Sequence, residues 1–265
     1  MHRFSSLCLN FGLTLIISAL IFTPSAQRAT ASIPKTNVPV IRPEIISTLP
    51  HDTKAFTQGF LYNDGYLYES TGIVGRSSLR KIDATNGELK VFIPAPGVFG
   101  EGIALFGNEL VQLTWKSQIA IRYSFPDLNH LGTFRYSGEG WGLTSDSEGF
   151  IMSNGSDTLY FRDSSFETYR KLPVTLDGRA VQKLNELNYS NGSIYANVWK
   201  QNYIVEIDPE SGKVLRLIDA SELVRRELPL GPEQVLNGIA YNQDEDLWYL
   251  TGKEWQNIYK VRLPQ

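Results

Sequence analysis

Residues 99–115 have the sequence FGEGIALFGNELVQLTW, which we interpret as two short strands that begin about ten residues apart. The first strand carries a polar residue, Glu101, between Gly100 and Gly102, and the second ends in Trp115. Short runs of Val, Ile, Tyr, Phe and Trp separated by Gly, Asn and Asp turn signals continue along the chain. Such runs are typical of β-hairpins and not of helices.

This two-strand unit recurs five times. Its first strand is found in Phe56-Thr57-Gln58-Gly59-Phe60, Phe99-Gly100-Glu101-Gly102-Ile103, Gly140-Trp141-Gly142-Leu143-Thr144, Leu184-Asn185-Glu186-Leu187 and Leu236-Asn237-Gly238-Ile239-Ala240. Equivalent positions are separated by 43, 40, 45 and 51 residues, and most units add a third strand. A four-stranded repeat of this length predicts the blade of a β-propeller. A β-sandwich, the alternative, has no reason to repeat one motif at even spacing.

We therefore predict an all-β, five-bladed β-propeller with four-stranded blades, formed as a single domain by residues 39–265. The last unit ends at residues 258–263 without an outer strand. Residues 40–47 precede the first unit, so we expect an N-terminal strand from this stretch to close the ring and hide its edges. The one helix that we expect spans residues 219–228, with Leu223 and Val224 toward a core.

The first residues predict an export signal. A short basic start is followed by apolar residues 7–22 and then by small residues, which is typical of a secretory signal peptide over residues 1–31, with a linker at 32–38. Cleavage before Ser32 fits the Ala-Thr-Ala sequence that precedes it, cleavage after Ala26 is the second choice, and an uncleaved anchor is the alternative. We expect a protein exported to a periplasm or secreted, with no membrane attachment after cleavage.

The composition excludes several classes of site. The chain of 265 residues has 25 Lys and Arg, 28 Asp and Glu, a net charge of −3, three His and one Cys. The single Cys8 lies in the predicted signal peptide and cannot form an internal disulfide. A mildly acidic chain without a basic run argues against nucleic acid as a partner, and so few His and Cys argue against a Cys-based or His-ligated metal site.

Polar and aromatic residues at the strand ends form the candidate site. In a propeller the first strands line the central channel, so Gln58, Glu101, Trp141, Asn185 with Glu186, and Asn237 should converge there, while the second strands end in Glu69, Trp115, Asn154, Trp199 and Lys253. Desolvation of a carboxyl group in a narrow, partly apolar channel raises its pKa toward a range useful for acid–base chemistry. A cation such as Lys253 nearby would lower the pKa again, so the sequence leaves the net pKa of Glu101 open.

Each candidate also has a purely structural interpretation. Glu101 could cap backbone amides, Lys253 could form a surface salt bridge, and Gln58 and Asn185 could satisfy buried backbone groups. A single Trp is more often core than cage, and Trp248 and Trp255 are expected in the core or at the rim. The coincidence of Trp115, Trp141 and Trp199 in three blades favours an aromatic cage.

The same motifs resemble those of a known family. The sequences F-T-Q-G at 56–59, Y-E-S-T-G at 68–72, F-G-E-G at 99–102, L-T-W at 113–115 and G-W-G-L at 140–143 are similar to those of plant-type glutaminyl-peptide cyclotransferases. So are L-N-E-L at 184–187, A-N-V-W at 196–199, L-N-G-I-A at 236–240 and T-G-K at 251–253. The likeness extends from about residue 44 to residue 263 and implies a five-bladed propeller, in agreement with the repeat.

The resemblance also implies an activity: conversion of N-terminal glutaminyl residues of peptides to pyroglutamyl residues with release of ammonia, without metal or cofactor. It implies that Glu101 is the catalytic acid, and we expect its carboxyl group to take a proton from the attacking amine and give it to the leaving nitrogen. The substrate-binding residues that it implies are Phe56, Gln58, Phe99, Trp115, Trp141, Asn185, Trp199 and Lys253. We expect peptides with N-terminal Gln as partners of a monomer. Small departures, such as Asn188 where an acid is common, affect no expected catalytic position.

Two other functions remain possible at this point. A non-catalytic propeller could use the three tryptophans as a cage for a sugar or a peptide. A propeller hydrolase could use bound calcium, although that chemistry needs several carboxylate oxygens at the channel, where this sequence offers mainly Glu101, amides and indoles.

Overall fold

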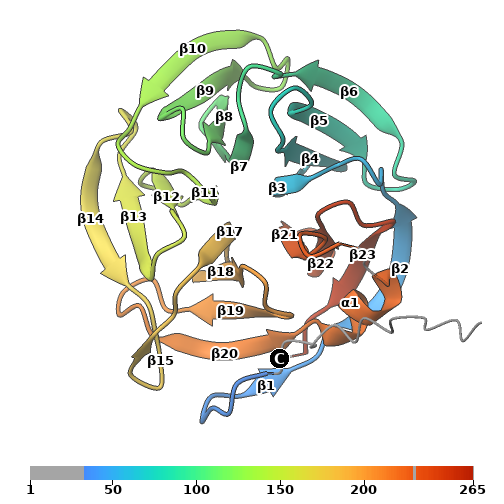
Figure 1. Ribbon diagram of the computed structural model, residues 1–265, viewed down its shortest axis with the longest axis vertical. Coiled ribbons are helices and arrows are strands. Elements are labelled where there is room, and N and C mark those ends of the chain that lie inside the picture. The colour runs from blue at the N-terminus through green and yellow to red at the C-terminus, as the bar shows by residue number, and fades with distance from the viewer. Residues whose placement is uncertain (1–32, 229–230, 265) are drawn as a thin grey trace, which may run out of the picture.

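The computed structural model describes residues 33–228 and 231–264, so the predicted signal peptide lies outside the described residues. Apart from one two-stranded hairpin, the strands of these residues form five sheets arranged in chain order around a central axis, as Figure 1 shows. The innermost strands, nearest the axis, are β3, β7, β11, β17 and β21, and in each sheet the strands that follow the innermost one lie progressively further out. The predicted five-bladed β-propeller is confirmed.

Consecutive strands within a blade pair in antiparallel fashion. Blade 1 contains β3 (Thr57–Asn63), β4 (Tyr66–Thr71), β5 (Ser78–Asp83) and β6 (Leu89–Pro94). Blade 2 contains β7 (Gly100–Phe106), β8 (Glu109–Thr114), β9 (Ile119–Ser124) and β10 (His130–Arg135). Blade 3 contains β11 (Leu143–Ser145), β12 (Phe150–Met152), β13 (Thr158–Arg162) and β14 (Thr168–Pro173).

The remaining strands build the last two blades and a small hairpin. The hairpin, β15 (Thr175–Leu176) with β16 (Arg179–Ala180), follows blade 3. Blade 4 contains β17 (Leu184–Ser190), β18 (Ser193–Val198), β19 (Tyr203–Ile207) and β20 (Val214–Asp219). Blade 5 contains β21 (Leu236–Asn242), β22 (Leu247–Gly252), β23 (Asn257–Arg262) and the N-terminal β2 (Glu44–Pro50).

The N-terminal segment closes the ring, but not with the expected bounds. Strand β2 pairs antiparallel with β23 and is the outer strand of blade 5, as predicted. Residues Val40–Ile41, which we expected in the same strand, instead form β1, which pairs parallel with β20 of blade 4. Pro43 separates the two strands and has no N–H to continue a ladder. The segment therefore joins two neighbouring blades.

Repeated glycines allow the inner strands to approach one another. A Cβ atom added at Gly59 would lie 2.5 Å from the backbone nitrogen of Ile103, on the inner strand of the next blade. A Cβ at Gly102 would meet the backbone of Gly142 and Leu143, and one at Gly142 would meet Asn185. The glycine of the repeat is thus required by close backbone contact around the axis.

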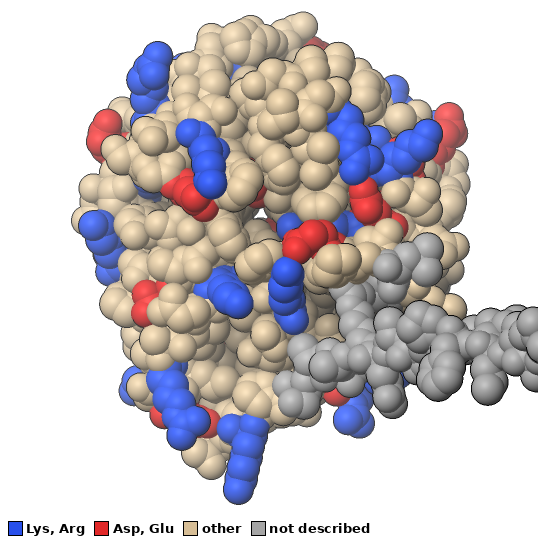
Figure 2. All heavy atoms as spheres, viewed as in Figure 1, with Lys and Arg blue, Asp and Glu red and all other residues tan. Residues whose placement is uncertain are grey.

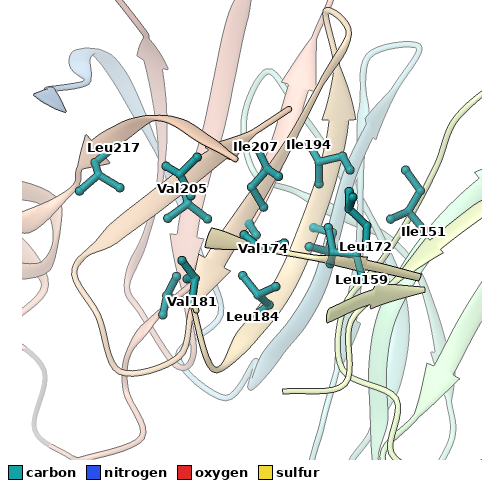
Figure 3. Packing of buried hydrophobic residues seen from close by; sticks show 14 of the residues in the cluster. Ile151, Leu159, Leu172, Val174, Val181, Leu184, Ile194, Val205, Ile207 and Leu217 are labelled. Atoms are coloured by element: carbon teal, nitrogen blue, oxygen red, sulfur yellow. The ribbon is translucent and has the colours of Figure 1, made fainter. Parts of the chain in front are cut away.

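Apolar clusters fill the spaces between and within blades. One cluster joins blades 3 and 4, where Ile151 and Leu159 pack against residues of β18 and β19 and against Val174 beside the hairpin, as Figure 3 shows. Trp248 and Trp255 are both buried in the cluster of blade 5, which places them in the core and not at the rim.

The helix is shorter than predicted. It is α1 (Ser221–Glu227), with Leu223 buried and Val224 packed against the blade 5 core, as expected. Asp219 remains in β20, paired with Tyr203, and its carboxylate accepts the Ser221 backbone N–H. In the described part of the chain, no helix combines the length and apolar character needed to cross a bilayer.

Candidate active site

A cavity of about 340 Å³ lies at one end of the propeller axis. It is lined by Phe56, Gln58, Phe99, Glu101, Trp115, Trp141, Asn185, Trp199, Glu233 and Lys253. The structure therefore brings together all nine residues that the sequence singled out for the site, and it adds Glu233.

The propeller topology explains this convergence. Gln58, Glu101 and Asn185 lie at the N-terminal ends of the inner strands β3, β7 and β17, which all begin on the same face of the ring. Strands that pair antiparallel with them end on that face, so residues that directly follow β8, β18 and β22 also reach it. Those residues are Trp115, Trp199 and Lys253.

Four other residues from the same strand ends do not line the cavity. Asn237 donates hydrogen bonds to the Thr57 carbonyl at 3.0 Å and to Gln58 Oε1 at 3.3 Å, so it positions Gln58. Glu186 is buried and accepts the backbone N–H of Phe60 at 3.3 Å. Asn154 accepts hydrogen bonds from Ser156 in its own turn, and Glu69 belongs to a separate buried cluster.

That cluster joins blade 1 to blade 5 behind the cavity wall. His51 Nε2 lies 2.8 Å from Glu69 Oε1, and His51 Nδ1 lies 3.0 Å from the Trp255 carbonyl oxygen. Thr57 Oγ1 donates to Glu69 at 2.6 Å, and Arg80 lies 3.7 Å from the other carboxylate oxygen. Burial opposes a charged His51, but the Glu69 carboxylate outweighs it and raises the pKa of His51. Both ring nitrogens face acceptors, which fits an imidazolium.

Glu101 is the isolated carboxyl group of the cavity. It is 3 % exposed, and its carboxyl group has no hydrogen-bond or ion-pair partner among the described residues. Burial raises the pKa of Glu101 well above its usual value, against the nearby positive charge of Lys253, while the Glu139 carboxylate raises it further. The structure therefore does not support a role for Glu101 as a cap of backbone amides. Its carboxyl group is free to exchange protons with a ligand.

Lys253 is the buried cation of the cavity. It is 4 % exposed, so it is not a surface salt-bridge residue, and its Nζ lies 4.8 Å from the centre of the Phe56 ring. Burial lowers the pKa of Lys253 to about 8, although Glu101 and Glu233 oppose this change. Lys253 can thus lose or keep its proton close to neutral pH.

Aromatic rings form the walls of the cavity. Phe99 contacts Phe56 edge-on at 6.0 Å and Trp115 at 5.5 Å between ring centroids. Trp141 contacts Trp199 edge-on at 5.8 Å between ring centroids. Such edge-on and tilted pairs fix the rings in place.

Two glutamates that we did not single out hold the indoles. Glu139 Oε2 accepts the Nε1–H groups of both Trp115, at 2.7 Å, and Trp141, at 3.0 Å. Glu233 Oε2 accepts that of Trp199 at 3.3 Å. A sequence signal did exist, because Trp115 and Trp199 are each followed by Lys, and each of these lysines pairs with the glutamate in question. The glutamates themselves lie in loops outside the repeated motif.

Comparison with known proteins agrees with this geometry. Residues 15–263 match the sequence model of the glutamine cyclotransferase family. The chain belongs to this family. Among curated proteins, a glutaminyl-peptide cyclotransferase from Arabidopsis thaliana is 38 % identical over 228 residues, which are 84 % of this chain and 71 % of that protein. The resemblance seen in the motifs is therefore confirmed.

Solved structures place this glutamine cyclotransferase family member among propellers. The crystal structure of Myxococcus xanthus glutaminyl cyclase superimposes with a TM-score of 0.81 at 37 % identity, covering 85 % of this chain and 98 % of that one. The WD40 repeats of RRP9 align with a TM-score of 0.52 at 11 % identity over 84 % of this chain and 99 % of that one, which shows likeness of fold alone.

Proposed function

We propose that the protein is a glutaminyl-peptide cyclotransferase, which converts an N-terminal glutaminyl residue of a peptide into a pyroglutamyl residue and releases ammonia. The observation that carries this proposal is the unpartnered, buried Glu101 beside Lys253 in an aromatic cavity. Membership of the glutamine cyclotransferase family, the Arabidopsis relative and the Myxococcus structure support the same activity.

The reaction requires one proton to move between two nitrogens of the substrate. The neutral α-amine attacks the γ-carboxamide carbon, a C–N bond forms, and the C–N bond to the amide nitrogen breaks as ammonia leaves. We propose that the Glu101 carboxylate takes a proton from the attacking amine and gives it to the departing nitrogen. A carboxyl group with a raised pKa suits both steps, because it accepts and returns a proton near neutral pH.

The polar residues of the cavity suit the charge that develops during attack. Lys253, as an ammonium, and the Gln58 amide would stabilise the negative charge on the γ-carbonyl oxygen. The Asn185 Oδ1 atom is buried and has no hydrogen-bond partner among the described residues, so it can accept an N–H of the substrate. The indoles would exclude water and hold the side chain folded toward its own amine.

We propose that this chemistry proceeds without a metal. Within residues 33–228 and 231–264, no three His, Cys, Asp or Glu side chains come together as ligands for an ion. The direct test is ammonia release from a Gln-initiated peptide, with and without a chelator. Turnover that resists the chelator supports the proposal, loss of turnover with the chelator would indicate a metal enzyme, and tight peptide binding without turnover would indicate the cage-type binding propeller.

We also propose that residues 1–31 direct export, that the mature chain is free of the membrane, and that it is a monomer. N-terminal sequencing of the protein recovered from the producing cells tests cleavage before Ser32 against cleavage after Ala26. Sedimentation of the mature chain tests the monomer, and a dimer mass would contradict it.

A further inference from the structure

The two carboxylates that hold the indoles have more than one contact each. Glu139 accepts from Trp115, which follows strand β8 of blade 2, and from Trp141, which precedes β11 of blade 3. A single carboxylate oxygen therefore ties together two cavity walls from different blades. The other carboxylate oxygen, Glu139 Oε1, lies 3.6 Å from Lys116 Nζ. The Lys116 ammonium also lies 4.0 Å from the centre of the Trp115 ring.

The same arrangement is found at Trp199. Glu233 accepts the Trp199 indole N–H and pairs with Lys200 at 2.7 Å, and Lys200 Nζ lies 4.4 Å from the centre of the Trp199 ring. On the face shown in Figure 2, acidic and basic side chains lie next to one another around the central hollow. Because the arrangement recurs at a second tryptophan of the cavity, it is not one chance contact.

The Glu139 carboxylate also acts electrostatically on Glu101, the group proposed to transfer the proton. Three charged or titratable groups act on Glu101: Lys253, Glu139 and Tyr136. Burial and the Glu139 carboxylate raise the pKa of Glu101, whereas Lys253 lowers it. Glu139 itself stays ionised, because hydrogen bonds from Trp141 and Trp115 and the charge of Lys116 outweigh its partial burial and lower its pKa.

We propose that Glu139 is a positioning residue for the cyclisation: its carboxylate locks Trp115 and Trp141 into one rigid wall and sets the field in which Glu101 exchanges its proton. Glu233 holds Trp199 in the equivalent way. Glu139 lies outside the cavity lining and acts without touching the substrate, whereas Glu233 lines the cavity itself. This inference rests on the proposed function for its kinetic part, while its structural part concerns the protein without substrate.

Two variants separate the two roles of Glu139. In Glu139→Gln the amide oxygen still accepts from the indoles but the charge is gone. We expect the pKa of Glu101 to fall in this variant. In a plot of kcat against pH, the change that accompanies loss of the Glu101 proton should therefore move to lower pH. In Glu139→Ala the indole contacts are also lost, and we expect kcat/KM to fall about 10- to 100-fold as the wall loosens. Glu88→Gln removes an exposed carboxylate that pairs with Lys90 at 2.7 Å far from the cavity lining and is the matched control.

A spectrum of the indole N–H groups without substrate supplies an independent readout. We expect the Trp115 and Trp141 signals to shift in Glu139→Ala and to stay in Glu88→Gln, with the buried Trp255 signal unchanged in both. Unchanged signals together with wild-type kcat/KM in Glu139→Ala would overturn the proposal, as would an unchanged pH profile in Glu139→Gln. If the wild-type protein released no ammonia, the proposed function would fail, and the indole spectrum would still decide whether Glu139 holds the wall.

Discussion

Replacing Glu101 by Gln should affect activity and stability in opposite directions. The substitution keeps the size of the side chain but removes the group proposed to move the proton. Loss of a positioned general acid–base group lowers the rate about 10²- to 10⁴-fold, or about 3–5 kcal/mol in the activation barrier. We therefore expect ammonia release from a Gln-initiated peptide to fall by that factor.

The effect on stability follows from burial without partners. Since burial raises the pKa of Glu101 above its usual value of 4.5, the folded protein disfavours the ionised form. The wild-type protein therefore keeps its full stability below the usual Glu pKa and loses stability as the pH rises toward the pKa of Glu101 in the folded state. The Glu101→Gln variant has no ionisable group here and loses no stability over this range. Urea denaturation should give equal free energies of unfolding for both proteins near pH ~4 and a higher one for Glu101→Gln at neutral pH. Each 1 kcal/mol gained should raise Tm by about 2–4 °C.

Glu186→Gln is the matched control, because Glu186 is equally buried on an inner strand and burial also raises its pKa. It lies outside the cavity lining and accepts the Phe60 backbone N–H, so we expect a change in stability in the same direction with wild-type activity. If Glu101→Gln kept an activity within about 10-fold of wild type, the proposed proton transfer by Glu101 would be refuted. A variant that is less stable than wild type at neutral pH would show that the Glu101 carboxylate has favourable partners that the structure lacks.

Three further predictions concern other parts of the molecule. Because the pKa of Lys253 lies at about 8, we expect wild-type kcat to fall as the pH rises through that value, and Lys253→Arg to show no such fall in a pH profile. His51→Leu leaves the buried Glu69 carboxylate without its main partner, which should cost about 3–5 kcal/mol in urea denaturation. This loss of stability should be largest below the usual His pKa of 6.5 and should shrink as the pH rises through the raised pKa of His51. A loss of stability that does not depend on pH would contradict the assignment of His51 as an imidazolium. Gly142→Ala places a Cβ against the Asn185 backbone and should cost at least about 1–3 kcal/mol, whereas Gly97→Ala, with open space around it, should cost little, and equal costs would disprove the close-packing argument.

Much of the site was predictable because a propeller repeats. Once the five units are aligned, residues at equivalent strand ends must meet on one face, and this is why Gln58, Glu101 and Asn185 lie in the same cavity. The same rule over-predicted Asn237 and Glu186, whose side chains serve the backbone of neighbouring strands instead. Alternation along a strand decides which of two adjacent residues faces the cavity, and irregular pairing at these strand starts hides that choice from the sequence.

What lay outside the repeat could not be predicted in this way. Glu139 is 24 residues from Trp115 in the sequence and belongs to a loop outside the repeated motif, so the Lys that follows Trp115 is the one local sign that the two meet. His51 and Glu69 pair only because the ring closes and brings the N-terminal segment against blade 5. The division of the N-terminal segment between β1 and β2 depends on which blade edge is open, which is also a property of the closed ring.

The sequence by itself determined the five-bladed ring and the residues at its inner strand ends, because strand length, turn residues and the glycines needed for close contact are local properties that recur with the repeat. The tertiary structure alone decided the protonation of the site. The raised pKa of Glu101 and the lowered pKa of Lys253 arise from burial and from charges contributed by other blades, and both depend on distances through space that no spacing along the chain contains.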